Sequence, residues 1–278
     1  MAISPVSAPP VPHAPPGPSR SSPLALRGLR CWLTTYRRTW RSSFLSSAFG
    51  PMFYLGAIGF GLGKLVNSHG TSAIGGVSYV AFVAPGILCM QAMNTGMRES
   101  TFPVSGALRW TSTYISAQAT PLRPAHIFRG HLMFMTGRVA LNSFMYLIFM
   151  AAFGAIHSWE VIFSYLVAVL TGLAFAAPIA AWAVTLKVDT AFNYMYRIVM
   201  VPLMMFSGTY YPVALLPGWL RPVVYASPLW QGVDLARPLS LGHSLTLTTA
   251  TGHVAYLLAL VVVGVWAGGR TYKRRLYV

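Results

Sequence analysis

The stretch VIFSYLVAVLTGLAFAAPIAAWAVTL, residues 161–186, contains no Asp, Glu, Lys or Arg. About 20 apolar residues in a helix cross the hydrocarbon core of a bilayer, so this stretch predicts a transmembrane helix. Five other stretches are also free of charge and long enough to span a membrane; they are residues 42–63, 65–97, 139–159, 198–220 and 238–269.

The composition of the whole chain agrees with a membrane protein. Of its 278 residues, 55% are hydrophobic and only 9% are charged, and the mean hydropathy is +0.57. A soluble domain carries about a quarter of its residues as charges. We therefore expect an all-α polytopic membrane protein, with six transmembrane helices near residues 44–62, 77–97, 133–156, 161–186, 198–213 and 253–268.

The basic residues indicate the orientation of these helices. The chain has 20 Lys and Arg against 4 Asp and Glu, a net charge of +16. With six spans, 17 of the basic residues fall on the side of the two termini, and Lys64, Arg221 and Arg237 fall opposite. Basic loops stay in the cytoplasm, so both termini are predicted to be cytoplasmic. Because the basic residues flank the spans, nucleic acid is not an expected partner.

The segment before the first span divides into two parts. Residues 1–23 are rich in proline and are expected to form a disordered cytoplasmic tail, followed by one transmembrane domain at 24–278. No basic stretch followed by an apolar run opens the chain, so no cleavable signal peptide is expected. Apolar residues then recur at steps of three and four, which predicts an amphipathic interfacial helix that either only anchors the chain or also touches a cytoplasmic partner. They are Leu26, Leu29, Leu33, Tyr36 and Trp40.

The sequence offers little catalytic chemistry. All four acids, Glu99, Glu160, Asp189 and Asp234, lie at or beyond the ends of the predicted spans, which disfavours carboxylate-coupled transport and hydrolysis within the membrane. His126 and His131 have no acid or cysteine at metal-ligand spacing, so no metal site is predicted. The glycine run at 59–63 is not a phosphate loop, because Ile58 and Leu65 occupy positions that need Gly and Ser or Thr. No cofactor is therefore expected in this chain.

Two long connections carry patterns of their own. In the cytoplasmic connection, a helix-compatible run at 110–119 ends before Pro121 and Pro124, and predicts a short helix that either docks a soluble partner or only connects two spans. The external connection, 211–239, is broken by prolines yet is rich in apolar residues, so its pieces are expected to dip into the outer leaflet. Asp234 and Arg237, three positions apart on the last piece, predict a local ion pair.

Three blocks resemble one known family: YVAFVAPGILCMQAMNTGMRE at 79–99, ATPLRPAHIFRG at 119–130, and PLMMFSGTYYPVALLPGWLRPVVYASPLWQGVDLARPL at 202–239. Together with the order of elements over 24–278, they are similar to the permease subunit of bacterial type-2 ABC exporters. The most similar branch contains the nodulation lipo-oligosaccharide exporter and the daunorubicin-type drug exporter. The resemblance implies a separate soluble ATPase subunit that binds ATP and Mg, a second permease copy with a homodimer favoured over a heterodimer, and contact with membrane lipid.

The resemblance also implies roles for particular residues. Residues 24–43 would be the connecting helix, and 212–229 the external re-entrant helices. Glu99 matches an acid of the family, and it is grouped here with Asp234 and Arg237 as a structural residue. The helix that couples the permease to the ATPase would be contained in 110–123, with Trp110, Tyr114, Ile115, Thr120, Pro121, Leu122 and Arg123 as its contact residues.

The function expected from these observations is transport and not catalysis. The chain would be the membrane permease of an ATP-driven exporter in the cytoplasmic (inner) membrane, moving a glycolipid, a lipo-oligosaccharide or a drug-like molecule. A secondary transporter and a membrane-embedded lipid-modifying enzyme are the alternatives. Side chains on the first, second and fifth spans would line the substrate pathway, although the methionines among them fit ordinary helix packing equally well. These are Phe53, Met90, Gln91, Met93, Asn94, Met97, Met204, Met205 and Phe206.

Overall fold

The computed structural model describes residues 24–68, 76–111, 113–118, 122–243 and 245–276. The predicted disordered tail at 1–23 lies outside these residues. Within them, all regular elements are helical. In chain order these are α1 (Leu24–Ala57), the π-helix η1 (Ile58–Leu62), α2 (Gly63–Ser68), α3 (Tyr79–Ser100), α4 (Phe102–Arg109), α5 (Thr113–Gln118), α6 (Pro124–Ala152), α7 (Val161–Ala183), α8 (Thr190–Tyr194), the π-helix η3 (Met195–Met200), α9 (Val201–Phe206), the 3-10 helix η4 (Val213–Leu215), α10 (Arg221–Tyr225), α11 (Pro228–Leu241) and α12 (Leu247–Leu276).

Four helical segments of the described chain are long and apolar enough to cross a membrane: α3 with α4, α6, α7 and α12. They cover most of the predicted second, third and fourth spans and all of the predicted sixth, so a polytopic all-α membrane protein is confirmed. The predicted first span is divided between α1 and η1, where serines and glycines lower the mean hydropathy. The predicted fifth span is divided among η3, α9 and the turn that follows, and none of these pieces is long enough alone.

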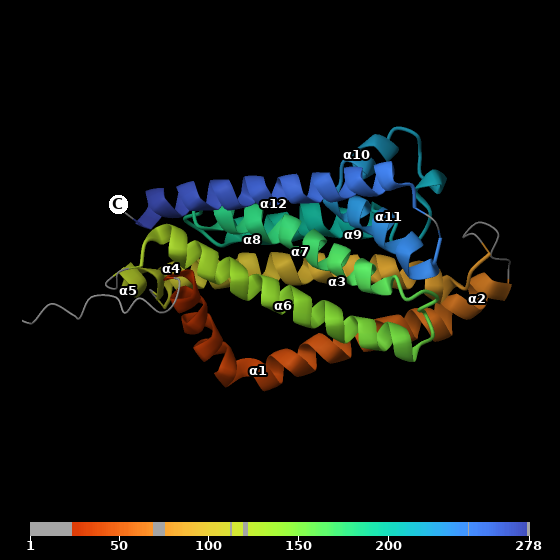
Figure 1. Ribbon diagram of the computed structural model, residues 1–278, viewed down its shortest axis with the longest axis horizontal. Helices are drawn as coiled ribbons and strands as arrows, with labels where there is room; N and C mark the ends of the chain where they lie inside the picture. The colour runs from red at the N-terminus through yellow and green to blue at the C-terminus, as the bar shows by residue number, and fades with distance from the viewer. Residues whose placement is uncertain (1–23, 69–75, 112, 119–121, 244, 277–278) are drawn as a thin grey trace, which may run out of the picture.

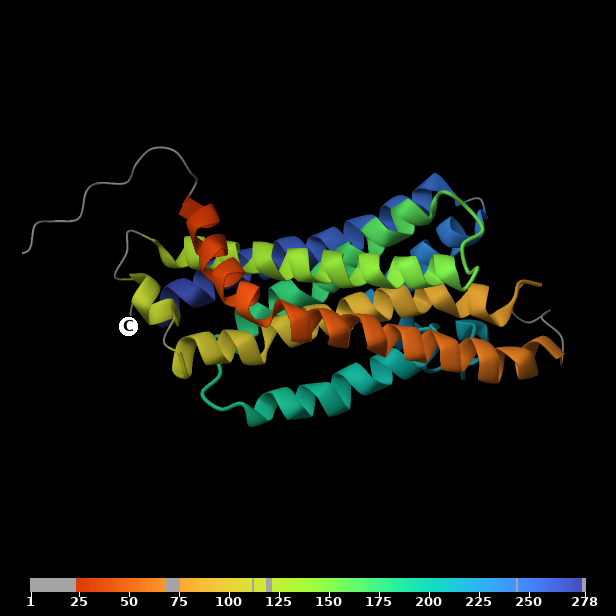
Figure 2. The ribbon, with the colours of Figure 1, turned by 90° about the horizontal axis from the view of Figure 1, so that it is seen from below.

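Helix α7 occupies the centre of the bundle and packs against α3, α6, α11 and α12. The crossing of α3 and α7 is especially close, because Gly96 and Gly172 lie where the two backbones meet. A Cβ atom on Gly172 would lie 2.7 Å from the carbonyl oxygen of Ala92. Small residues at such a crossing let transmembrane helices approach each other, which replaces the hydrophobic driving force that lipid does not supply. Figures 1 and 2 show the long helices running side by side.

The structure joins two N-terminal elements that the sequence predicted as separate. The expected interfacial helix and the first part of the expected first span form one helix, α1, which bends along its length (Figure 1). Its later part packs along α6 and reaches η1 and α2 at the far end of the bundle.

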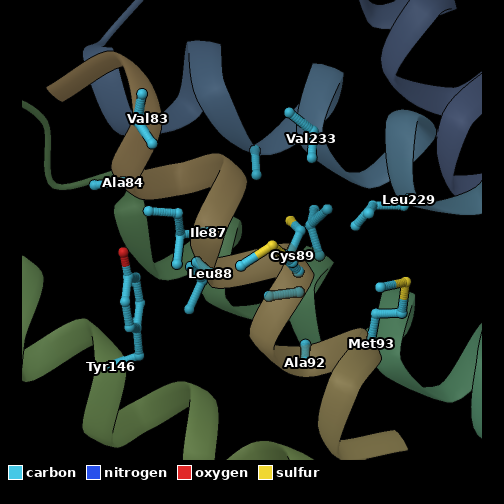
Figure 3. Packing of buried hydrophobic residues seen from close by; sticks show 14 of the residues in the cluster. Val83, Ala84, Ile87, Leu88, Cys89, Ala92, Met93, Tyr146, Leu229 and Val233 are labelled. Carbon is cyan, nitrogen blue, oxygen red and sulfur yellow. The ribbon is translucent and has the colours of Figure 1, made fainter. Parts of the chain in front are cut away.

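The connection predicted to be external forms short helices between α9 and α12. The longest, α11, starts where the hydroxyl of Ser227 accepts a hydrogen bond from the backbone N–H of Leu229 at 3.2 Å. It packs against α3 and α7, with Leu229 and Val233 buried in the same core as Ile87 of α3 (Figure 3). This segment therefore contributes to the core of the bundle.

Candidate functional site

A cavity of about 330 Å³ lies between α1, α3, α6 and α9. Helix α3 supplies more of its wall than any other element, through side chains three and four positions apart on one face. Polar and charged residues outnumber apolar ones among the lining residues, which is unusual between helices that are apolar elsewhere. The lining residues are Gly50, Tyr54, Met90, Gln91, Asn94, Thr95, Arg98, Glu99, Arg138, Asn142 and Met204.

Uncharged amide groups form the middle of the cavity wall. The Asn94 side chain donates to Gln91 Oε1 at 3.2 Å, and the Asn142 side chain donates to Thr95 Oγ1 at 3.1 Å. The amide oxygens of Asn94 and Asn142 are buried and accept no hydrogen bond from any described residue. A buried acceptor without a donor costs free energy. Rotation of either side-chain amide toward the cavity would expose its oxygen to a hydrogen-bond donor of a bound molecule.

An ion pair closes one end of the cavity. Arg138 Nε of α6 donates to Glu99 Oε1 of α3 at 2.9 Å, and Arg138 Nη1 donates to the hydroxyl of Tyr36 of α1 at 2.9 Å. The guanidinium carbon also lies 4.8 Å from the centre of the Tyr36 ring. The two charged side chains are only 12% and 17% exposed. This network joins three helices where the predicted interfacial segment of α1 meets the bundle.

Tyrosines close the other end. The hydroxyls of Tyr54 and Tyr210 are hydrogen-bonded to each other, and the Tyr210 hydroxyl also donates to Met90 Sδ at 3.3 Å. Tyr79 donates to the carbonyl oxygen of Tyr210 at 3.1 Å. Met90 precedes Glu99 by nine positions, about 13 Å along a helix that rises 1.5 Å per residue. The cavity is thus bounded by a charged group and a tyrosine cluster about that far apart.

The predicted pathway residues fall into three groups. Met90, Gln91, Asn94 and Met204 line the cavity. Two others, Met93 and Met97, are fully buried in the helix core, as Figure 3 shows for Met93. The remaining three are exposed on the outside of the bundle, and a pathway role for all nine stays a prediction. The exposed three are Phe53, Met205 and Phe206.

Sequence reasoning missed the contribution of α6 to the cavity. Arg138 and Asn142 are four positions apart and therefore share one face of the helix. They are polar residues at one edge of a long apolar stretch, and their spacing was a signal that could have located this wall.

The predicted coupling region forms a second cluster at the end of the bundle that carries the C-terminus (Figure 1). Tyr114 of α5 is buried, and its hydroxyl is hydrogen-bonded to His131 Nδ1 of α6 and lies 3.3 Å from the hydroxyl of Tyr272 of α12. The His131 ring stacks on Trp32 of α1, with the ring centres 3.6 Å apart. Burial, with a smaller contribution from Tyr272, raises the pKa of the Tyr114 phenol well above its ordinary value, so the group stays neutral.

The other predicted coupling residues lie differently. Trp110 and Ile115 are 66% and 53% exposed, Arg123 is exposed and Leu122 is half-buried. Thr120 and Pro121 lie outside the described residues. Tyr114 thus anchors α5 to three helices, whereas Trp110, Ile115 and Arg123 form the surface that a partner could contact.

The connection that follows α7 is fixed to this same end of the bundle. Arg109 of α4 pairs with Asp189 and is hydrogen-bonded to the carbonyl oxygen of Lys187. Ser105 donates to the same carboxylate at 2.5 Å. A displacement of α4, and of α5 with it, would therefore also displace the start of α8.

The two faces of the predicted interfacial helix have different surroundings. Within α1, Leu26, Leu29 and Tyr36 are half-buried, while Leu33 and Trp40 are exposed. The half-buried face packs on α6, where a Cβ on Gly28 would lie 3.2 Å from the carbonyl oxygen of His126. Contact of the exposed face with lipid or a partner stays a prediction.

The predicted ion pair between Asp234 and Arg237 is wrong. Asp234 Oδ2 lies 3.3 Å from His253 Nε2 of α12. Arg237 donates to the carbonyl oxygens of Phe82 at 3.1 Å and Gly208 at 2.6 Å. Gly208 follows the end of α9, so its carbonyl has no helical partner, and the several donors of a guanidinium can satisfy it. The two residues therefore join α11 to other segments.

Comparison with known proteins assigns the family. The sequence model of the ABC-2 type transporter family matches residues 29–239. The chain is 29% identical to Nodulation protein J of Rhizobium leguminosarum bv. trifolii over 253 residues, which cover 88% of this chain and 94% of that protein. It is 28% identical to Nodulation protein J of Rhizobium meliloti (strain 1021) and 27% to that of Bradyrhizobium diazoefficiens, with the same coverage of both chains.

These matches confirm the predicted resemblance and favour an exporter over a secondary transporter or a lipid-modifying enzyme. The absence of a phosphate loop from the sequence agrees with an ATPase on another chain. The chain belongs to the ABC-2 type transporter family, as the multi-pass membrane permease of an ATP-driven exporter whose ATPase is a separate subunit.

Proposed function

We propose that the chain crosses the bacterial cytoplasmic membrane six times, with both termini in the cytoplasm. The four long apolar helices supply four crossings, and α1 with η1, and α8 with η3 and α9, supply the first and fifth. Exposed apolar side chains on both of these segments, such as Phe53 and Ile198, support a lipid or protein environment around them. The uneven distribution of basic residues supports the orientation.

The substrate of this exporter is an amphipathic or hydrophobic molecule, such as a glycolipid, a lipo-oligosaccharide or a drug-like compound, and the cavity forms part of its path. The observation that carries this proposal is the pair of unpartnered amide oxygens on Asn94 and Asn142 beside the thioethers of Met90 and Met204. Amides can hydrogen-bond to hydroxyl and N–H groups without demanding a charge, and thioethers adapt to apolar shapes.

The active assembly contains a second permease copy, a homodimer in preference to a heterodimer, and ATPase subunits that bind ATP and Mg. Exposed apolar side chains of α8, η3 and α9, such as Tyr194, Ile198 and Met205, supply a face for the second copy, and Met204 of α9 also lines the cavity. Trp110 and Ile115 supply the contact with the ATPase, because large exposed apolar side chains are typical anchors of protein interfaces.

The test measures export by the permease reconstituted with its ATPase subunit. Asn94→Leu and Asn142→Leu remove the two acceptors with little change in volume, and each is expected to lower export about tenfold while the permease still stimulates ATP hydrolysis. Thr251→Leu is the control, because Thr251 is an exposed polar residue of α12, outside the cavity and outside the face assigned to the second copy. If both cavity variants export like the control, the substrate takes another path.

A further inference from the structure

A second, larger cavity opens on the opposite side of the bundle from α1. It has a volume of about 760 Å³ and lies between α7, α11 and α12. Its walls are apolar side chains such as Phe163, Leu166, Leu170, Leu239 and Val254. Leu166 is 55% exposed, so the groove is open to the surroundings of the bundle. An apolar groove of this size on a membrane protein matches the hydrocarbon part of a ligand.

Two polar residues, Glu160 and His243, stand among the apolar lining. Glu160 precedes α7, and its side chain makes no capping hydrogen bond to that helix. Each of the other three carboxylates lies within 4.0 Å of an Arg or His side chain, whereas no described basic residue lies that close to Glu160. A carboxylate without a basic partner beside an apolar groove is available to pair with a cationic group from outside the protein.

His243 is fixed beside the same groove by the end of α11. Gly242 has a φ of 75°, and the His243 N–H donates to the carbonyl oxygen of Pro238 at 2.9 Å, which closes the helix. The imidazole is exposed and can donate a hydrogen bond to an acceptor outside the protein. Trp159, next to Glu160, is 75% exposed, and exposed tryptophans of membrane proteins concentrate at the headgroup layer.

We propose that this groove binds a phospholipid whose zwitterionic headgroup carries a primary ammonium, as in phosphatidylethanolamine. The ammonium donates hydrogen bonds to the Glu160 carboxylate, His243 donates to the phosphate, and an acyl chain lies along Leu166 and Leu170. A primary ammonium can donate where the quaternary ammonium of phosphatidylcholine cannot. An anionic headgroup without an amine would meet the Glu160 charge and gain nothing from it. The site is separate from the cavity assigned to the substrate path.

The binding test uses the purified full-length chain in detergent with added lipids of identical acyl chains, and native mass spectrometry counts the lipids retained. The unmodified protein is expected to retain phosphatidylethanolamine about tenfold better than phosphatidylcholine or phosphatidylglycerol. Glu160→Gln should abolish that preference. Leu166→Trp should reduce retention of all three lipids, because the larger side chain fills the groove.

Lys64→Gln is the matched control. It removes a charge at the same end of the bundle, on α2 and outside the groove, and should leave retention unchanged (Figure 1). Equal retention of the three lipids by the unmodified protein would overturn the proposal, as would an unchanged preference in Glu160→Gln. A variant that elutes as aggregate is replaced by Glu160→Asp, which keeps the charge, shortens the side chain and is expected to weaken the preference without abolishing it.

Discussion

Helices α3 and α12 are both apolar, yet they occupy opposite environments. The apolar stretch of α3 and α4 is 78% buried inside the chain and that of α12 is 11% buried, although α12 has the higher mean hydropathy, 1.8 against 1.3. Hydropathy therefore indicates that a helix avoids water, but not whether lipid or protein surrounds it. Close backbone contact occurs in both helices: Gly264 brings α12 against α7, and Gly96 and Gly172 let α3 and α7 meet directly.

The largest expected effect comes from breaking that contact. Gly172→Val places a Cβ 2.7 Å from the carbonyl oxygen of Ala92, so α3 and α7 must separate. We expect the free energy of unfolding to fall by about 3 kcal/mol. Thermal unfolding in detergent, followed by the loss of the monodisperse elution peak, measures this change. Gly252→Val on α12, where a Cβ meets nothing within 4 Å, should change stability by less than about 1 kcal/mol. Equal losses in the two variants would show that the α3–α7 crossing is not specially close.

A smaller loss is expected at the ion pair between α3 and α6. Arg138→Met leaves the Glu99 carboxylate without its basic partner in a largely buried position. The free energy of unfolding should fall by about 2 kcal/mol, and Glu99→Gln in the same chain should restore part of it, because the uncompensated charge is removed. Arg270→Met is the control: Arg270 lies over the Trp266 ring at 3.7 Å on the exposed face of α12. If the losses in free energy of unfolding of Arg138→Met and Glu99→Gln simply added in the double variant, the two residues would not be energetically coupled.

Sequence patterns predicted the helices but not the side of each that faces inward. The charge-free stretches contain α7 and overlap α3, α6 and α12, because charge is excluded from the membrane whatever surrounds the helix. Met93 and Met97 lie on the buried side of α3, whereas Gln91 and Asn94 face the cavity. The polar stripe of Gln91, Asn94, Thr95 and Arg98 has the helical period and marks the cavity face, but the methionines of α3 lie on more than one face, so periodicity could not tell which of them line the cavity.

The partners of charged residues were equally beyond sequence reasoning. Asp234 and Arg237 lie three positions apart, which made a local pair the simplest hypothesis. Their actual partners, His253 and the carbonyl oxygens of Phe82 and Gly208, are brought close only when α11 packs against α3 and α12. Contacts of this kind depend on topology, which no local pattern encodes.

The coupling region offers a comparison between a buried and an exposed residue of one short segment. Trp110→Ala removes an exposed aromatic side chain, and we expect about tenfold weaker binding of the ATPase subunit with the permease still folded. Tyr114→Phe removes only a buried hydroxyl, and should lower the free energy of unfolding by about 1 kcal/mol while the affinity for the ATPase stays within about twofold. Copurification at graded ATPase concentrations and thermal unfolding separate the two effects. The reverse pattern would place the docking surface on the other side of α5.

The smallest effect is expected on the outer face of α12, where Val262 is 64% exposed. If lipid alone covers this face, Val262→Trp meets a fluid surface and should change the free energy of unfolding by less than about 0.5 kcal/mol, with no change in assembly mass by light scattering. Met205→Trp on α9 is the matched change on the face assigned to the second copy, and should shift the assembly toward monomers. Exposure in one chain does not distinguish lipid from a partner, because both are apolar. A partner protein has a fixed shape and cannot accommodate the larger side chain, whereas lipid can. A reduced assembly mass in Val262→Trp would therefore show that the second copy contacts α12 and not α9.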